Sequence, residues 1–109
     1  MVKAIYTKSQ VNSILEKYKQ LLHQRKVNFD GLYLFGSYAK RKPRAWSDID
    51  IAVISEKFGK DPIREAVKLD EIADEVSLSI EPHPVNTRDF KNITLPICRE
   101  IRENGVAVE

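Results

Sequence analysis

Cysteine is almost absent from this sequence, as are the long apolar runs that membrane proteins need. A single residue, Cys98, excludes an internal disulfide. No apolar run approaches the roughly 20 residues that cross a bilayer, and no segment resembles a signal peptide. No linker or internal repeat is visible, and 109 residues suffice for one modest core. We therefore expect a single domain spanning 1–109, located in the cytoplasm and without a membrane partner.

Acidic residues are scarce in the first half of the chain only. Lys and Arg outnumber Asp and Glu by 10 to 4 over 1–54, whereas 55–109 contain 8 against 12, so the two halves carry +6 and −4. A short basic cluster lies within the first half. It either attracts nucleotide phosphates or is a solvated loop that keeps the protein soluble. The cluster consists of Lys40, Arg41, Lys42 and Arg44.

Hydrophobic periodicity predicts alternating helices and strands. Apolar residues at three- and four-residue spacing indicate a first helix that begins after a Ser9 cap and ends near Arg25. The apolar run 32–35 predicts a buried strand, and 38–42 a short helix stopped by a proline. The later elements are a strand over 48–55, a helix from Asp61-Pro62 to about Val76, an edge strand over 78–85 that has Glu81 just before its end, a helix over 95–104, and a strand over 106–108.

Two carboxylates begin the strand expected over 48–55. Asp48 and Asp50 are two positions apart, so on a strand they project from the same face about 6.5–7 Å apart. Such a face is not that of an ordinary two-sided core strand, and a pair of this kind can share divalent cations. The alternative is a pair of solvated acids at a strand entrance. The preceding Gly36-Ser37 pair favours the metal-binding interpretation.

Gly36 and Ser37 follow the first strand directly. A strand that ends in glycine and turns into a helix presents free backbone N–H groups and the positive end of a helix dipole to an anion. Gly36 lets phosphates approach closely, and Ser37 adds a hydroxyl donor. Lys40 or Arg41, one turn further on, can neutralise charge on the same triphosphate.

Together these motifs resemble a known family. The segments LFGSYA (34–39), SDIDIAV (47–53), IEPHPV (80–85) and ICREIRENGV (97–106) are similar to the minimal nucleotidyltransferases of the DNA polymerase β superfamily. The resemblance implies an α/β (α+β) nucleotidyltransferase fold, in which helices pack against a mixed sheet. It also implies that Asp48, Asp50 and Glu81 are catalytic and hold two Mg²⁺ ions. Glu81 departs from the family pattern, where the third acid is usually Asp.

The same resemblance implies a function. Short stand-alone members, the MntA-like proteins, are antitoxins of toxin–antitoxin pairs whose toxin is a helical ribonuclease of the HEPN class. They transfer AMP from ATP to a tyrosine hydroxyl of the toxin. The alternatives are a binding module that neutralises its partner by occlusion, and transfer to a small molecule or an RNA end. Direct nucleic-acid binding is not expected, and the formation of a homo-oligomer is possible.

Four further residues allow more than one interpretation. Glu81 is either the third metal ligand or a solvated acid of an edge strand. His83, between two prolines, either binds a metal or has a structural or exposed role; we expect the second, because it lacks Cys or His neighbours at ligand spacing. Cys98 is expected to be a small core residue. Trp46 either stacks on a base, meets a partner protein or covers the edge of the core.

Overall fold

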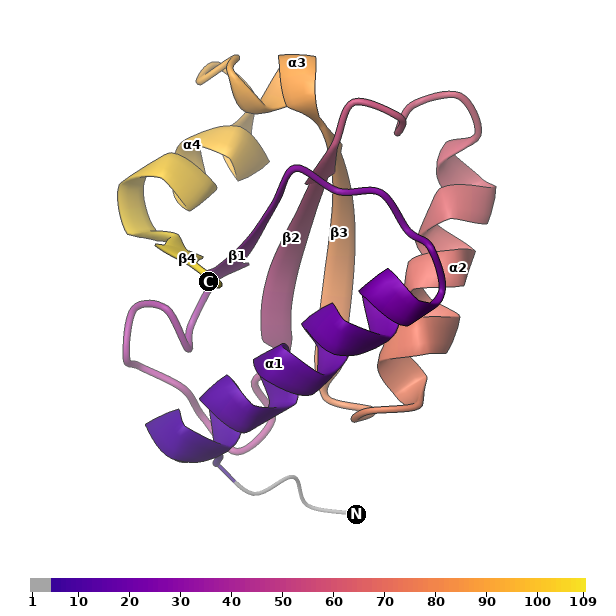
Figure 1. Ribbon diagram of the computed structural model, residues 1–109. Helices are drawn as coiled ribbons and strands as arrows, with labels where there is room; N and C mark the ends of the chain where they lie inside the picture. The colour runs from indigo at the N-terminus through magenta and orange to yellow at the C-terminus, as the bar shows by residue number, and fades with distance from the viewer. Residues whose placement is uncertain (1–4) are drawn as a thin grey trace.

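The computed structural model describes residues 5–109, which form a four-stranded mixed sheet with helices on both faces (Figure 1). The strand order is β3-β2-β1-β4. The elements are α1 (Lys8–Gln24), β1 (Gly31–Phe35), β2 (Ile49–Ser55), α2 (Pro62–Asp74), β3 (Ile80–Asn86), α3 (Thr87–Phe90), α4 (Pro96–Asn104) and β4 (Val106–Ala107).

The sheet combines both kinds of strand pairing. The central strands β1 and β2 run antiparallel, and β4 also pairs antiparallel with β1. β3 runs parallel to β2, which requires the crossover that α2 provides. Two prolines, Pro82 and Pro84, lie in β3, and this is tolerated because β3 is an edge strand. The expected mixed sheet with packed helices is confirmed.

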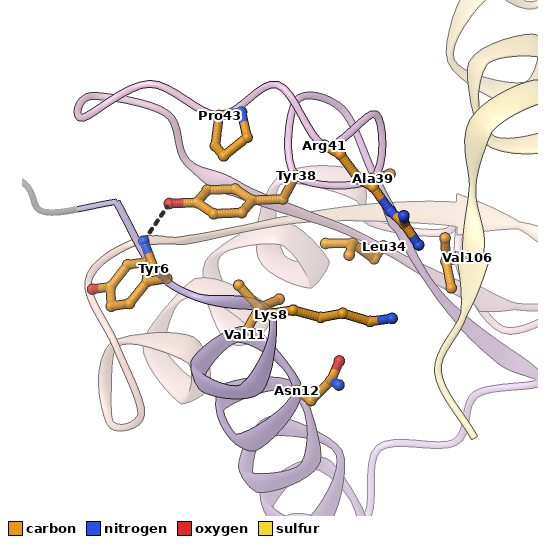
Figure 2. Close-up of a pocket in the computed structure, with 10 residues that line it drawn as sticks. All are labelled: Tyr6, Lys8, Val11, Asn12, Leu34, Tyr38, Ala39, Arg41, Pro43 and Val106. Atoms are coloured by element: carbon orange, nitrogen blue, oxygen red, sulfur yellow. Dashed lines mark hydrogen bonds between the residues drawn. The ribbon is translucent and has the colours of Figure 1, made fainter.

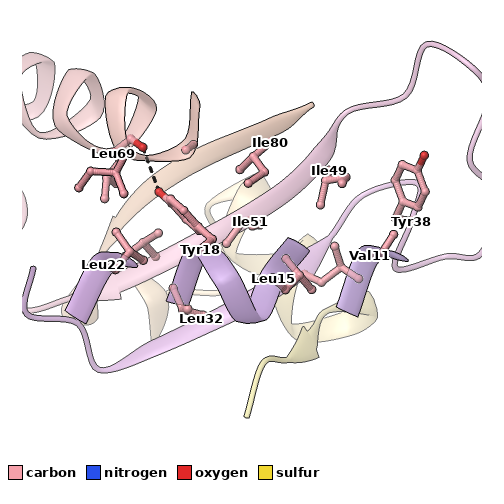
Figure 3. Close-up of a cluster of buried hydrophobic side chains, with 14 residues drawn as sticks. Val11, Leu15, Tyr18, Leu22, Leu32, Tyr38, Ile49, Ile51, Leu69 and Ile80 are labelled. Carbon is pink, nitrogen blue, oxygen red and sulfur yellow. Dashed lines mark hydrogen bonds between the residues drawn. The ribbon is translucent and has the colours of Figure 1, made fainter. Parts of the chain in front are cut away.

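The larger core lies between the sheet and helices α1 and α2. Leu15, Tyr18 and Leu22 of α1 project at helical spacing onto Ile51 and its neighbours on this face of the sheet (Figure 3). The fully buried Tyr18 hydroxyl donates a hydrogen bond to the carbonyl of Leu69 in α2, at 3.1 Å. Burial raises the pKa of Tyr18, so the phenol stays neutral and keeps this donor.

A smaller core occupies the opposite face, beneath α3 and α4. Cys98 and Ile101 of α4 pack on Phe35, Ala52 and Ile54. Cys98 is therefore a buried core residue, as expected. Beyond its acidic start, β2 is buried on both faces, so it is a two-sided core strand after all. The carboxylates are confined to the end that α4 leaves uncovered.

Several local expectations were wrong. The first helix begins after Thr7, not Ser9, because Thr7 and Gln10 form a reciprocal capping box. No helix forms over 38–42; the segment is an irregular turn, and the extra short helix is α3. Leu78 lies outside β3 and is 79% exposed. Glu81 lies at the start of β3, not near its end, because the prolines are accommodated inside the strand.

No helix within the described residues has both the length and the apolar character that a bilayer span demands.

The Tyr18–Leu69 hydrogen bond should contribute measurably to the packing of α1 against α2. We expect Tyr18→Phe to lower the free energy of unfolding by about 1 kcal/mol, because it removes one buried hydrogen bond while keeping the ring. Urea denaturation measures the change. Tyr33→Phe is the matched control, since the half-buried Tyr33 packs through its ring against Phe90. An equal loss in both variants would contradict a specific role for the Tyr18 hydroxyl.

Candidate functional site

The parallel register of β2 and β3 brings two predicted acids together. Asp50 and Glu81 are Cα partners at the beginning of their strands, so both side chains project from the face that α4 covers further along. Asp48 immediately precedes β2, and its carboxyl contributes to the raised pKa of Glu81, so these two acids also lie near each other. All three acids predicted from the sequence therefore lie at one end of the sheet.

His83 also lies at this site, although metal binding was the less favoured interpretation of its place in the sequence. Its Nε2 lies 3.2 Å from Oδ1 of Asp50 and 4.0 Å from Oε1 of Glu81. One ligand atom from each of these three residues lies within 4.8 Å of the other two. The signal that could have found His83 is its position two residues after Glu81, which places both side chains on one face of a strand.

The electrostatics of the cluster favour a bound cation. Burial raises the pKa of Glu81 above its usual range; His83 opposes this shift, while Asp50 and Asp48 reinforce it. A positive ion would relieve the repulsion among the acids. Carboxylate oxygens are the ligands that Mg²⁺ prefers, so the donor set fits a divalent cation. The side chains of Asp50 and Glu81 remain 24% and 53% exposed, which gives the ion access.

Gly36 lies directly against this acidic cluster. A Cβ added at Gly36 would overlap Oδ2 of Asp50 and lie 3.1 Å from its Cγ. The residue also has a φ of +75°, which favours glycine. Only glycine therefore lets the chain leave β1 while passing the Asp50 carboxylate. The predicted phosphate-binding backbone and the predicted metal ligands are in contact.

The segment after Gly36 turns without forming a helix. Lys40 N–H donates to the Gly36 carbonyl at 3.1 Å, and Lys42 N–H donates to the Ser37 carbonyl at 2.9 Å. Arg41 has a φ of +59°, which breaks any regular helical path. The expected helix dipole is therefore missing, and the half-buried Ser37 stands at the start of a turn. Any anion contact here depends on individual donors.

The structure separates the two predicted cationic residues. Lys40 forms a 3.0 Å ion pair with Glu100 of α4, on the same face of the sheet as Asp50. Arg41 instead lines a pocket of about 400 Å³ together with Lys8 and Asn12 (Figure 2). Leu34 also lines that pocket and belongs to the α1 core, so Arg41 is directed to the other face. The acidic cluster and Arg41 are not brought together.

Trp46 lies in the loop that leads to Asp48. Its ring is 69% exposed, and the guanidinium of Arg44 lies 5.6 Å from the ring centre. The ring does not cover the edge of the core, which excludes one of the three roles considered from the sequence.

Comparison with known proteins identifies the fold. The family model described as "Polymerase beta, Nucleotidyltransferase" matches residues 9–108. No curated protein gives a significant match. A crystal structure described as a toxin–antitoxin with AMP-PNP has a TM-score of 0.54 and 25% identity, over 86% of this chain and 71% of that chain.

Two further solved structures share the fold. A mutant of the MntA–HpeT toxin–antitoxin, in which two aspartates two positions apart are replaced by glutamate, has a TM-score of 0.52 and 23% identity over 86% of this chain and 71% of that chain. A Sulfolobus solfataricus protein provisionally described as a nucleotidyltransferase has a TM-score of 0.52 and 16% identity over 94% of this chain and 87% of its own.

The contact between Gly36 and Asp50 makes a testable prediction about metal binding. Gly36→Ala and Gly59→Ala should each lower the free energy of unfolding by about 1 kcal/mol or more, because both glycines have positive φ. If the cluster binds Mg²⁺, the ion should raise the melting temperature, and only Gly36→Ala should reduce that rise, because its Cβ displaces the Asp50 carboxylate.

Gly59 is the matched control because a Cβ there meets nothing closer than Asn86 Nδ2 at 3.9 Å. Thermal unfolding with and without Mg²⁺ measures the difference. An undiminished Mg²⁺ effect in Gly36→Ala would show that Gly36 has no part in forming the site.

Proposed function

This chain belongs to the polymerase β nucleotidyltransferase family, and on that basis we propose that it transfers AMP from ATP to a hydroxyl of a partner protein. The observation that supports this most directly is the in-register pair of Asp50 and Glu81, with Gly36 held against Asp50. A carboxylate cluster beside a glycine-lined turn is suited to holding a cation next to a polyphosphate. The nucleotide ATP and the protein acceptor are parts of the proposal.

The residues divide the work of such a transfer. Backbone groups at Gly36 and the hydroxyl of Ser37 contact the phosphates, and Asp48, Asp50 and Glu81 hold two Mg²⁺ ions. Bound Mg²⁺ would neutralise the charge on the phosphates while that charge redistributes during the transfer. Glu81, in register with Asp50, accepts the proton of the attacking hydroxyl.

The covalent change is a simple displacement at phosphorus. The acceptor oxygen forms a bond to the α-phosphorus of ATP while the bond from that phosphorus to the bridging oxygen breaks. Pyrophosphate leaves with the bonding electron pair, and the acceptor proton passes to Glu81. The open end of the sheet suits this reaction, because the half-exposed carboxylates can meet a hydroxyl presented by another molecule.

We further propose that the partner is a toxin and that this chain is its antitoxin. The similar structure described as a toxin–antitoxin with AMP-PNP supports both the partner and an adenine nucleotide. The resemblance noted in the sequence makes the acceptor a tyrosine of a HEPN-class ribonuclease, with both proteins in the cytoplasm. The exposed Trp46, adjacent to the acids, is available for contact with such a partner.

The proposed mechanism predicts which acids matter. Asp48→Asn and Asp50→Asn should each lower AMP transfer by at least about 100-fold, because loss of even an outer-shell metal partner costs 10- to 100-fold. Transfer of label from α-³²P-ATP to the co-purified partner measures the rate. Asp74→Asn, at the exposed end of α2, is the control and should retain full activity. Undiminished transfer in Asp50→Asn would refute the mechanism.

A second candidate is neutralisation by occlusion, without chemistry. The longer, half-exposed Glu81 in place of the usual Asp favours it, since a misplaced carboxylate weakens catalysis. The two functions differ in stoichiometry. A catalyst present at about one part in 50 should inactivate the whole partner population, and intact-mass spectrometry should then show a gain of one or more AMP units. Protection only at equimolar protein, without a mass gain, would support occlusion.

A further inference from the structure

We propose that His83 is a direct nitrogen ligand of the cation held by Asp50 and Glu81, so that the site has a higher affinity for later first-row cations such as Co²⁺ and Zn²⁺ than its carboxylates alone would give it. This inference rests on the proposed function, because it concerns the same metal site. The inference goes beyond that function in two ways. It adds a ligand that the carboxylate motif does not contain, and it names the class of metal that this ligand selects.

The distances around His83 can be compared with those of a metal coordination sphere. Ligands at about 2.1 Å from a common ion lie about 3.0 Å apart in octahedral geometry and about 3.4 Å apart in tetrahedral geometry. The Nε2 atom of His83 lies 3.2 Å from Asp50 Oδ1 and 4.0 Å from Glu81 Oε1. The first distance fits such a sphere, whereas the second exceeds it by about 0.6–1.0 Å, so the half-exposed Glu81 side chain must move toward His83 for the three atoms to contact one ion.

The imidazole ring is held in this position by its neighbours. Its centre lies 5.0 Å from that of the Phe35 ring, which it meets edge-on at 63°. Ala52, the β2 residue in register with His83, carries only a methyl group and leaves room for both rings. The His83 side chain is 29% exposed, so the ring is fixed by packing while its Nε2 faces the open end of the sheet.

The chemistry of the donor set then determines metal preference. Carboxylates and water suit Mg²⁺ and Mn²⁺, whereas imidazole adds affinity for later first-row metals such as Co²⁺ and Zn²⁺. For a nitrogen–metal bond, Nε2 must offer its lone pair, so the ring proton resides on Nδ1. Asp48 lies outside this cluster of three and offers oxygen only. The site therefore combines one mixed nitrogen–oxygen position with an oxygen-only ligand.

Direct detection of the nitrogen bond tests the inference. Untagged protein is loaded with Mn²⁺, and pulsed EPR records modulation by a coordinated ¹⁴N nucleus. We expect this signal in the unaltered protein and in His23→Phe, but not in His83→Phe. His23 is the matched control because it is the other histidine of the chain and also packs against an aromatic ring, at 4.8 Å from Phe29.

Calorimetric titrations with Mg²⁺ and Co²⁺ supply a second measurement. His83→Phe should weaken Co²⁺ binding by about 10-fold or more, while Mg²⁺ binding changes by less than about threefold. His83→Gln keeps a hydrogen-bond donor to Asp50 but lacks the imidazole nitrogen. If His83 only orients Asp50, His83→Gln will retain Co²⁺ affinity, and that result would overturn the inference.

The failures of the inference and of the proposed function are distinguishable. Mn²⁺ that binds without a ¹⁴N signal, together with intact AMP transfer, would overturn the role of His83 alone. Absence of any divalent-ion binding would contradict the metal-dependent function as well. Circular dichroism of His83→Phe and His83→Gln shows whether each variant is folded; if both were unfolded, His83 would be structural and the inference would fail.

Discussion

The position of Asp50 is the constraint on which the rest of the structure depends. It lies at the start of a central strand, where neighbours on both sides must accommodate its carboxylate. On the β1 side this is possible only because Gly36 has no Cβ, and on the β3 side the register brings Glu81 and His83 alongside. A carboxylate in such a place destabilises the protein unless a positive charge or a hydrogen bond compensates it. Gly36 and His83, which are far apart in the sequence, thus both accommodate the Asp50 carboxylate, the first by leaving space and the second by contacting its Oδ1.

The fold isolates this charge from the rest of the sheet. Beyond Asp50, the same face of β2 continues with Ala52 and Ile54, which are buried beneath α4. The opposite face is covered by α1 and α2, and over residues 5–109 the buried side chains include no charged one. The hydrophobic cores therefore stabilise the strands, while the carboxylates are left at the uncovered end. The buried part of β2 thus contributes to stability, and its beginning carries the reactive carboxylate.

The sequence predicted the features that depend on local patterns. The apolar run before Gly36 and the alternation after Asp48 each identify a strand without knowledge of the fold, and the prolines of β3 correctly indicate an edge. The pairing of these strands into one sheet brings the predicted acids together. Asp61 and Gly105 also mark the observed start of α2 and end of α4, because caps are encoded by single residues.

Features that depend on contacts between distant segments were not predictable in this way. His83 has no Cys or His neighbour at ligand spacing in the sequence, and only the register of β3 against β2 places it beside Asp50. The turn over 38–42 failed as a helix because Arg41 adopts a positive φ, which no composition rule for arginine anticipates. That same turn directs Arg41 and Lys40 to opposite faces of the sheet. Residues adjacent in sequence thus serve different surfaces.

Glu81 lies on the edge strand β3, two residues before His83. Its Cα is in register with that of Asp50, so a side chain longer than aspartate extends past the Asp50 carboxylate toward solvent. Burial raises the pKa of Glu81, His83 opposes this shift, and Asp50 and Asp48 reinforce it. His83 also lies 3.2 Å from Asp50 Oδ1. The longer acid and the histidine therefore lie together beside Asp50, where the histidine offsets part of the repulsion among the carboxylates.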